Sequence, residues 1–149
     1  MKISILISSY NKGPYIEKCL QSCLKQSDQG FELILIDNFS NDNTDLILKK
    51  YDANMIIKKE KKVSNYSAVN QLDLLKKAFS ESSGDIICFL DADDYFEENK
   101  LEKIKKIFSQ NQKIDVVFDK PNILIDKIVS NFTIKNKLSK YIWPTIYPT

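Results

Sequence analysis

Short apolar segments alternate with longer stretches of helical periodicity along most of this 149-residue chain. The apolar segments are rich in β-branched residues, which is typical of buried strands, and they cover residues 2–8, 31–37, 54–58, 85–90 and 114–118. Apolar residues at helical spacing, or a cluster of capping residues, predict helices over 14–24, 44–50, 64–81 and 101–108. Strands that alternate with helices favour an α/β fold, a three-layer α/β/α sandwich with a mostly parallel sheet.

The composition narrows the chemistry that the chain can perform. A net charge of +2 gives no electrostatic case for a nucleic-acid partner. Every basic residue is lysine, and histidine is absent. An acid or base must therefore be a carboxylate, Lys, Tyr or Cys, and a phosphate must be neutralised by lysine, backbone N–H groups or a metal ion. Lys12 and the lysines of residues 58–62 are expected on a solvated surface.

The cysteines and the amino terminus indicate the cellular compartment. The chain has an odd number of cysteines, Cys19, Cys23 and Cys88, and its first residues lack the features of a signal peptide. No apolar run approaches the roughly 18 residues of a membrane span. We expect a cytoplasmic protein whose cysteines are buried thiols rather than zinc ligands.

The apolar segment 85–90 stops at three carboxylates, Asp91, Asp93 and Asp94. Two carboxylates about 4 Å apart repel by roughly 4 kcal/mol at an effective dielectric of 20, so a positive charge is expected nearby. Oxygen ligands suit Mg²⁺ or Mn²⁺, which fill the rest of their coordination with water and phosphate. The alternative is that an aspartate caps the following helix or turn, but three carboxylates together favour the metal.

Two other polar motifs also follow predicted strands, SSYN at 8–11 and DNFSND at 37–42. Ligands of parallel sheets bind beyond the carboxyl ends of the strands, so the three motifs are predicted to form one site. Tyr10 could stack on a nucleobase, and Asp37 and Asn38 could hydrogen-bond a base or a ribose. The alternatives are a half-buried tyrosine and an Asx turn.

Three stretches, ISILISSYNKGPYIEKCLQSCLKQ, FELILIDNFSNDNT and SSGDIICFLDADDYF, together resemble the amino-terminal part of a family 2 glycosyltransferase. Their order and spacing are more specific than any one of them. The resemblance runs from Lys2 to Phe118 and implies the GT-A fold, which is a Rossmann-like nucleotide-binding fold. It also implies a nucleotide-sugar-binding core over residues 1–120 and the start of an acceptor-side region over 121–149.

The resemblance carries donor-binding roles onto the first two motifs. Ser8 and Tyr10 would lie against the nucleobase, with Tyr10 stacking on it. Asp37 and Asn38 match a family VDDGS stretch in which Asn38 replaces the second aspartate and Phe39 replaces the glycine. An asparagine can still accept a hydrogen bond from a pyrimidine N3–H.

The third motif matches the DxD motif of the family. By this resemblance Asp93 would contact the ribose or the metal, Asp94 would be the principal metal ligand, and Asp91 would complete the cluster. Asn70 resembles a family asparagine near the donor site.

The implied reaction is an inverting, metal-dependent transfer of a sugar from a nucleotide-diphospho-sugar to an acceptor hydroxyl, with Mn²⁺ or Mg²⁺ as cofactor. The donor would be a UDP- or dTDP-sugar and the acceptor a glycan or lipid-linked molecule. The pathway would be bacterial surface glycan synthesis, with possible peripheral contact at the inner face of the membrane. The family's base is a carboxylate later in the sequence and is expected beyond Thr149, because Asp115, Asp119 and Asp126 lack a matching motif.

Four alternative functions make different demands on the sequence. A truncated module could bind nucleotide and metal without transferring a sugar. A receiver domain requires an acidic pair after the first strand, where this chain has SSYN. A dehydrogenase requires a G-x-G-x-x-G motif after that strand, and a nucleotidyltransferase requires a glycine- and arginine-rich first loop.

Overall fold

A parallel sheet of four strands is the centre of the structure, a computed structural model that describes residues 1–51, 55–111, 113–118, 123–125 and 128–130. The strand order is β3-β2-β1-β4, and every pairing is parallel. The strands are β1 (Ile3–Ser9), β2 (Phe31–Asp37), β3 (Ile56–Lys59) and β4 (Ile86–Asp91). The predicted sheet over these segments is confirmed, with β3 displaced by one or two residues from its expected range.

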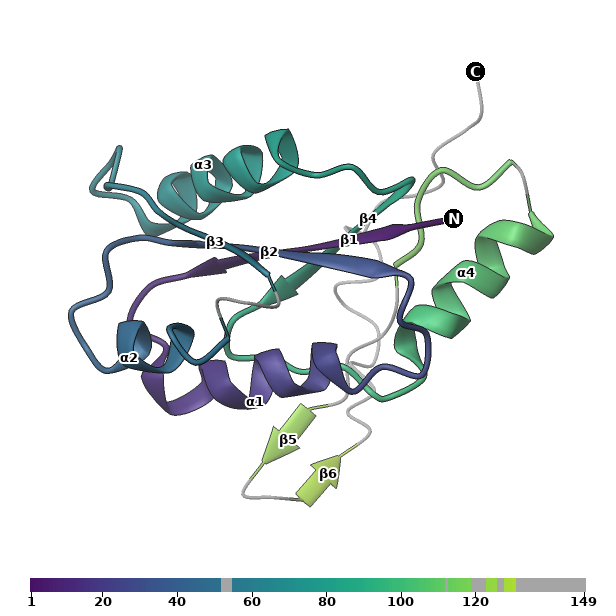
Figure 1. Cartoon of the computed structure of the whole chain (residues 1–149), viewed down its shortest axis with the longest axis horizontal. Helices are drawn as coiled ribbons and strands as arrows, with labels where there is room; N and C mark the ends of the chain where they lie inside the picture. The colour runs from purple at the N-terminus through teal and green to yellow at the C-terminus, as the bar shows by residue number, and fades with distance from the viewer. Residues whose placement is uncertain (52–54, 112, 119–122, 126–127, 131–149) are drawn as a thin grey trace, which may run out of the picture. The chain divides into compact units, whose positions relative to one another are not determined.

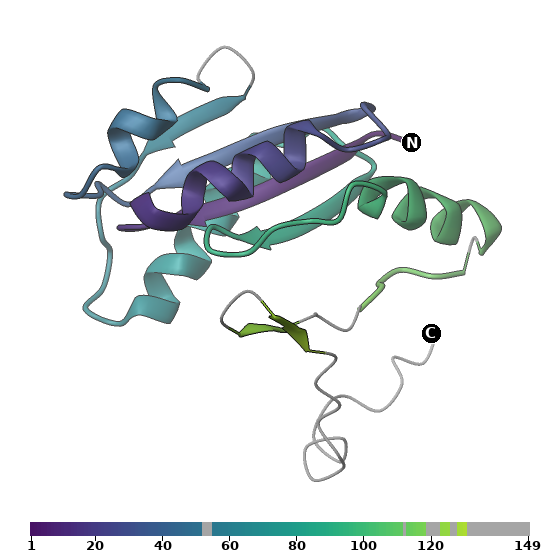
Figure 2. The same ribbon diagram turned by 90° about the horizontal axis from the view of Figure 1, so that it is seen from below.

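Helices cover both faces of this sheet, as Figures 1 and 2 show. Helix α1 (Gly13–Leu24) and the short α2 (Thr44–Leu48) lie on one face, and α3 (Ser67–Ser80) lies on the other. All seven residues of β1 are buried, which explains its unbroken apolar sequence. Leu74 and Ala78 of α3 pack against Leu6, Ile34 and Ile36 of the sheet. The predicted three-layer α/β/α fold is confirmed.

Helix α4 (Lys100–Gln110) begins beside the end of α1. Leu101 is fully buried, and its backbone N–H donates to Gln26 Oε1 at 3.0 Å. The buried Gln26 amide also donates to the carbonyl oxygens of Ser22 and Glu97. One glutamine thus joins the end of α1 to the chain that leaves β4, and so fixes the path of the segment that carries the acidic motif.

Glu32 at the start of β2 ties the opposite end of the sheet together. Its carboxylate accepts hydrogen bonds from Lys2 Nζ (2.5 Å), Ser4 Oγ (2.5 Å) and both the backbone N–H and the hydroxyl of Ser83 (2.6 and 2.9 Å). Burial alone would raise the pKa of Glu32, but these donors hold the pKa at about 2.

Glu32→Gln is expected to destabilise the protein by about 2 kcal/mol at pH 7, a magnitude reduced for the partial exposure of the group. Because the folded-state pKa is depressed, the charged carboxylate stabilises the fold above about pH 4.5, and this contribution is lost as the pH falls towards 2. Urea unfolding at pH 7, 4 and 2.5 should therefore show a difference from wild type that shrinks with acidification. Glu17→Gln, at a half-exposed position, serves as control, and an equal deficit at every pH would contradict this account.

The chain divides into two compact units, residues 1–107 and 108–149. In the second unit β5 (Ile123–Ile125) pairs antiparallel with β6 (Ile128–Ser130). The boundary predicted at residue 121 stays a prediction.

The prediction of a strand at 114–118 is wrong, because these residues belong to no strand. Their β-branched and aromatic side chains favour an extended backbone, but a strand also requires a neighbouring strand for its ladder hydrogen bonds. None of the described strands pairs with 114–118. Asp119 and Asp126 lie outside the described residues, as does the aromatic segment 141–149.

The three cysteines are free thiols. Cys19 and Cys23 are buried, and Cys88 is partly buried. The hydrogen bond to Cys23, together with burial, raises the pKa of Cys19, and burial raises that of Cys88 to about 11. Cys19 and Cys88 therefore stay protonated at neutral pH. The prediction of buried thiols is confirmed for Cys19 and Cys23, and Cys88 is only partly buried.

None of the helices in the described part of the chain has the length and apolar character that crossing a membrane requires.

Candidate functional site

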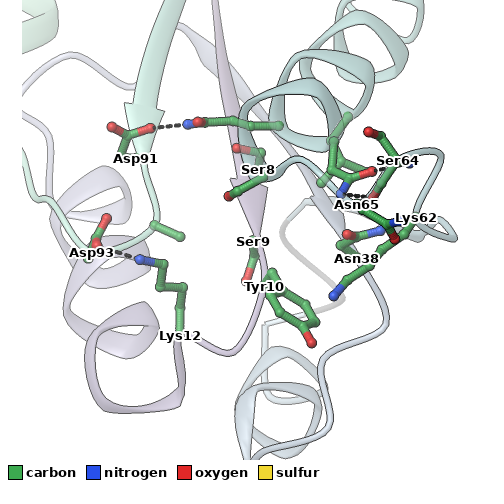
Figure 3. Close-up of a pocket in the computed structure, with 15 residues that line it drawn as sticks. Ser8, Ser9, Tyr10, Lys12, Asn38, Lys62, Ser64, Asn65, Asp91 and Asp93 are labelled. Atoms are coloured by element: carbon green, nitrogen blue, oxygen red, sulfur yellow. Dashed lines mark hydrogen bonds and ion pairs between the residues drawn. The ribbon is translucent and has the colours of Figure 1, made fainter.

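A cleft of about 460 Å³ opens at the carboxyl end of the sheet (Figure 3). Its walls come from the end of β1, the loop after β2, the segment leading into α3 with the start of that helix, and the end of β4. Predicted site residues that line it are Ser8, Tyr10, Asn38, Asn70, Asp91 and Asp93. The three polar motifs therefore meet at one edge of the sheet, as the positions of the strand ends predicted.

Two interlocked loops hold the β1 side of the cleft. The backbone N–H of Asn11 donates to Ser40 Oγ at 2.8 Å, and Asn11 Oδ1 accepts from the N–H of Asn41 at 2.9 Å. One residue further on, the N–H of Lys12 donates to Thr44 Oγ1 at 2.9 Å. The capping residues of 38–44 thus stabilise the turn that carries Tyr10 and Lys12, in addition to starting α2.

Tyr10 and Asn38 form the part of the cleft that suits a nucleobase. Tyr10 is 39% exposed, and Lys62 Nζ lies 3.9 Å from the centroid of its ring. Asn38 is buried, and its Nδ2 donates to the Glu60 carbonyl oxygen at 2.6 Å. Because the amide nitrogen is held in this way, the oxygen Oδ1 remains the acceptor that Asn38 can offer to a ligand.

Asp37 and Asn70 have local partners. Asp37 is fully buried and accepts from the backbone N–H and the hydroxyl of Ser40, at 2.8 and 2.6 Å, which is the turn geometry that was the alternative at this position. Asn70 Oδ1 accepts from the N–H groups of Val63 and Ser64, and its Nδ2 donates to the Ser64 carbonyl oxygen. Asp37 shapes the loop behind the cleft, and Asn70 holds the loop that carries Lys62.

Phe39 has the left-handed backbone conformation that glycine adopts readily, with φ of 53°. By the resemblance described above, this is the position at which the family motif has glycine. A bulky L-residue in this region costs roughly 1–2 kcal/mol. The Phe39 side chain is 51% exposed, so burial of the ring offsets little of that strain.

Phe39→Gly is expected to stabilise the fold by about 1 kcal/mol, because it removes the Cβ that makes this conformation costly. The gain should appear as a higher urea midpoint with an unchanged slope. Phe39→Ala is the matched control, since it removes the ring but keeps the Cβ. If alanine stabilises as much as glycine, the effect comes from loss of the exposed ring and not from backbone strain.

The acidic motif faces the cleft from the end of β4. Asp91 Oδ1 accepts from Gln71 Nε2 of α3 at 2.8 Å, and Asp93 Oδ2 accepts from Lys12 Nζ at 2.5 Å (Figure 3). Asp94 is absent from the residues that line the cleft, and its backbone N–H donates to the Asp91 carbonyl oxygen at 2.9 Å. Two of the three predicted metal ligands therefore line the cleft, and the third, Asp94, closes the turn with its backbone and does not line it.

The charges of this motif act on one another. The hydrogen bond from Lys12 lowers the pKa of Asp93. Burial raises the pKa of Asp94, and so do the negative charges of Asp91 and Asp93. Negative charge therefore exceeds positive charge here even with Lys12 in place.

The donor set fits a hard divalent cation. Within the described residues, no three His, Cys, Asp or Glu side chains converge on one point as a preformed metal site. Mg²⁺ and Mn²⁺ need only one or two protein carboxylates when phosphate oxygens and water complete the shell, and Asp91 and Asp93 offer these from one loop. The negative charges of Asp91, Asp93 and Asp94 repel one another, and a bound cation would reduce this repulsion.

Residues that sequence reasoning missed also line the cleft. Lys12 and Lys62 were expected on a solvated surface. Lys62 is exposed, as expected, but it also lies over the Tyr10 ring at the cleft. Lys12 is only partly exposed and contacts Asp93, so the expectation is wrong for Lys12. Gln71 was not singled out. The position of Lys12 directly after Tyr10 and Asn11 could have indicated that it lies near the site. The sequence does not indicate its partner, because Asp93 is 81 positions away.

Comparisons with known proteins agree with this architecture. The family described as "Glycosyl transferase family 2" matches residues 4–142. An uncharacterized glycosyltransferase of Haemophilus influenzae is 37% identical over 115 residues, or 75% of this chain and 44% of that protein. The poly(ribitol-phosphate) beta-N-acetylglucosaminyltransferase TarP of Staphylococcus aureus is 31% identical over 123 residues, or 80% of this chain and 36% of TarP.

A solved structure is also similar. The crystal structure of S. aureus TarS matches with a TM-score of 0.63 and 27% identity, over 74% of this chain and 20% of that chain. The chain belongs to glycosyl transferase family 2. The predicted family and the GT-A fold class are thereby confirmed. The chain spans less than half the length of each of these relatives.

Proposed function

We propose that this chain forms the donor-binding part of a metal-dependent, inverting glycosyltransferase that uses a nucleotide-diphospho-sugar. One observation carries the proposal: a single cleft at the carboxyl edge of the sheet combines an aromatic ring, an amide acceptor and two carboxylates from three separate motifs. A nucleotide-sugar has groups that match them, which are a base for the ring and the amide, and a ribose and a diphosphate for the carboxylates, the diphosphate by way of a divalent cation.

Each side of the cleft has a role in this proposal. The Tyr10 ring stacks on the nucleobase, with Ser8 beside it, and Asn38 Oδ1 accepts a hydrogen bond from the base. Asp91 and Asp93, which line the cleft, bind the ribose and a divalent cation in this proposal, and Asp94 follows them in the same motif. Asp37 and Asn70 support the donor site through the loops that they hold.

The reaction proposed for the whole enzyme is an in-line displacement at the anomeric carbon. The acceptor oxygen forms a bond to that carbon, the bond to the diphosphate oxygen breaks, and its electron pair leaves with the nucleoside diphosphate. In the whole enzyme a carboxylate takes the proton of the acceptor hydroxyl. A bound Mn²⁺ or Mg²⁺ would neutralise the negative charge that develops on the leaving diphosphate.

The proposed substrates follow from the site and from a relative. Asn38 can accept from the N3–H that uracil and thymine share, which favours a UDP- or dTDP-sugar. TarP, by its name, transfers N-acetylglucosamine to poly(ribitol phosphate), and we propose a related bacterial surface glycan or its lipid-linked precursor as acceptor. Transfer would take place on the cytoplasmic side of the membrane, where a peripheral contact would bring the enzyme to such an acceptor.

Thermal unfolding with UDP, dTDP, GDP and CMP, each with and without Mn²⁺, tests the donor site. Saturation at 100 times the dissociation constant should stabilise by about 2.7 kcal/mol. We expect a metal-dependent increase in melting temperature with a uridine or thymidine nucleotide, and its loss in Asp93→Asn. Asp85→Asn, an exposed aspartate at the other end of β4, is the matched control. A well-folded protein with no shift for any nucleotide would contradict the proposal.

A further inference from the structure

Lys12 has an unusually well-fixed backbone for a lysine in a turn. Its N–H donates to Thr44 Oγ1, and its carbonyl oxygen accepts from the N–H groups of Tyr15 and Ile16, both at 2.8 Å, in the first turn of α1. The backbone is thus held by the loop after β2 on one side and by α1 on the other. The side chain starts from a rigid base at the mouth of the cleft.

From this base the side chain crosses the cleft to the acidic motif. Lys12 Nζ lies 2.5 Å from Asp93 Oδ2, and the lysine side chain is one-third exposed. Figure 3 shows the lysine reaching from the β1 side towards the loop that follows β4. The ammonium therefore lies against a carboxylate that is a candidate ligand of the divalent cation. A lysine has three N–H donors, and a phosphate oxygen can replace the carboxylate as its acceptor.

Few cations are available for a diphosphate in this cleft. The chain has no arginine or histidine, and the basic residues among those lining the cleft are Lys12 and Lys62. Lys62 lies over the Tyr10 ring, on the side of the cleft assigned to the base. Lys12 is therefore the cleft cation that lies beside the acidic motif.

We propose that Lys12 is the resident counter-ion of Asp93 in the empty cleft and the diphosphate-binding cation in the loaded one. The ammonium and a divalent metal compete for Asp93 while no nucleotide is bound. When a nucleoside diphosphate enters, its phosphate oxygens accept from Lys12, and Asp93 becomes available to the metal. Metal and nucleotide then bind with positive cooperativity, because each removes part of the cost of binding the other. This inference rests on the proposed function and assigns a role that the three motifs do not contain.

The test measures Mn²⁺ alone before any nucleotide is added. Free Mn²⁺ is followed by electron paramagnetic resonance in wild type, Lys12→Met and Lys25→Met. The last variant makes the same charge change at the exposed far end of α1. We expect Lys12→Met to bind Mn²⁺ alone roughly five- to tenfold more tightly than wild type, since the competing ion pair is gone. Lys25→Met should differ from wild type by less than about twofold.

The second part measures UDP in saturating Mn²⁺ by calorimetry. Lys12→Met should bind UDP roughly tenfold more weakly than wild type, because the diphosphate loses its lysine. The two effects of opposite sign identify an exchange of partners. Unchanged or weaker Mn²⁺ binding in Lys12→Met overturns the inference. If the lysine merely oriented Asp93, its removal would lower the affinity for Mn²⁺ as well as the affinity for UDP. Melting temperatures within about 2 °C of wild type would exclude a folding defect as the cause.

Failure of the proposed function has a different signature. In that case wild type itself binds no nucleotide with Mn²⁺. Failure of the Lys12 inference alone leaves wild type able to bind UDP with Mn²⁺, while Lys12→Met shows no gain in affinity for the metal.

Discussion

Gly84→Ala is expected to cost about 3 kcal/mol of folding stability and to lower the melting temperature by roughly 10 °C. Gly84 precedes β4 and passes close to the backbone of the central strand. An added Cβ would lie 2.6 Å from Ser4 N and 3.0 Å from the carbonyl carbon of Ile3, besides 2.5 Å from Ser4 Oγ. Those backbone atoms belong to fully buried residues at the start of β1, which pairs with a strand on each side, so they cannot move aside without disturbing the ladder.

Gly30→Ala is the matched control for this clash. A Cβ at Gly30 would meet chiefly the flexible end of the Lys105 side chain, at 2.5 Å, and Asp28 Oδ1 at 3.1 Å. The lysine can swing away, so we expect a loss below about 1 kcal/mol. Urea unfolding measures the loss of folding stability in both variants. Similar losses in Gly84→Ala and Gly30→Ala would show that the close approach to β1 is not the reason for glycine at position 84.

Tyr10→Ala is expected to weaken the binding of UDP by roughly ten- to a hundredfold in the presence of Mn²⁺. Stacking of a base on an aromatic side chain contributes about 1–3 kcal/mol, and in this cleft Tyr10 is the aromatic side chain among the lining residues. The loop bonds that hold its neighbours Asn11 and Lys12 involve backbone atoms and the Asn11 side chain, so the variant should fold normally.

Two further tyrosine variants separate stacking from other effects. Tyr10→Phe keeps the ring and should bind UDP within about threefold of wild type. Tyr15→Ala removes an exposed tyrosine of α1 that does not line the cleft, and it should bind as wild type does. Calorimetric titration supplies the dissociation constants. Binding by Tyr10→Ala at wild-type strength would show that the base does not lie on this ring.

The strands and the location of the site could be predicted because one physical pattern determines both. Strands covered by helices on both faces are continuously apolar, so β1, β2 and β4 are evident in the sequence, and the polar residue that ends each run marks the binding edge. Asp91, Asn38 and Tyr10 were placed correctly at the cleft for this reason. The segment 114–118 shows the limit of that reasoning, because strand propensity does not supply a partner strand.

The contacts across the cleft could not be predicted in the same way. Whether Lys12 meets Asp93, and Gln71 meets Asp91, depends on how α1 and α3 are placed against β4. Spacing along the chain contains no information about such pairs. The positive φ of Phe39 was equally hidden, because the residue itself disfavours the conformation that the loop imposes.

The most direct test of the donor cleft is a two-dimensional ¹H–¹⁵N NMR spectrum of the protein titrated with UDP and Mg²⁺. The account predicts that the largest amide shifts fall on the residues at the carboxyl edge of the sheet, from Tyr10 to Lys12, at Asn38 and from Asp91 to Asp93. Amides around Glu32 and Ser83, at the opposite end of the strands, should stay in place. Shifts concentrated at that opposite end, or none at millimolar UDP, would contradict the assignment of this cleft as a nucleotide-sugar site.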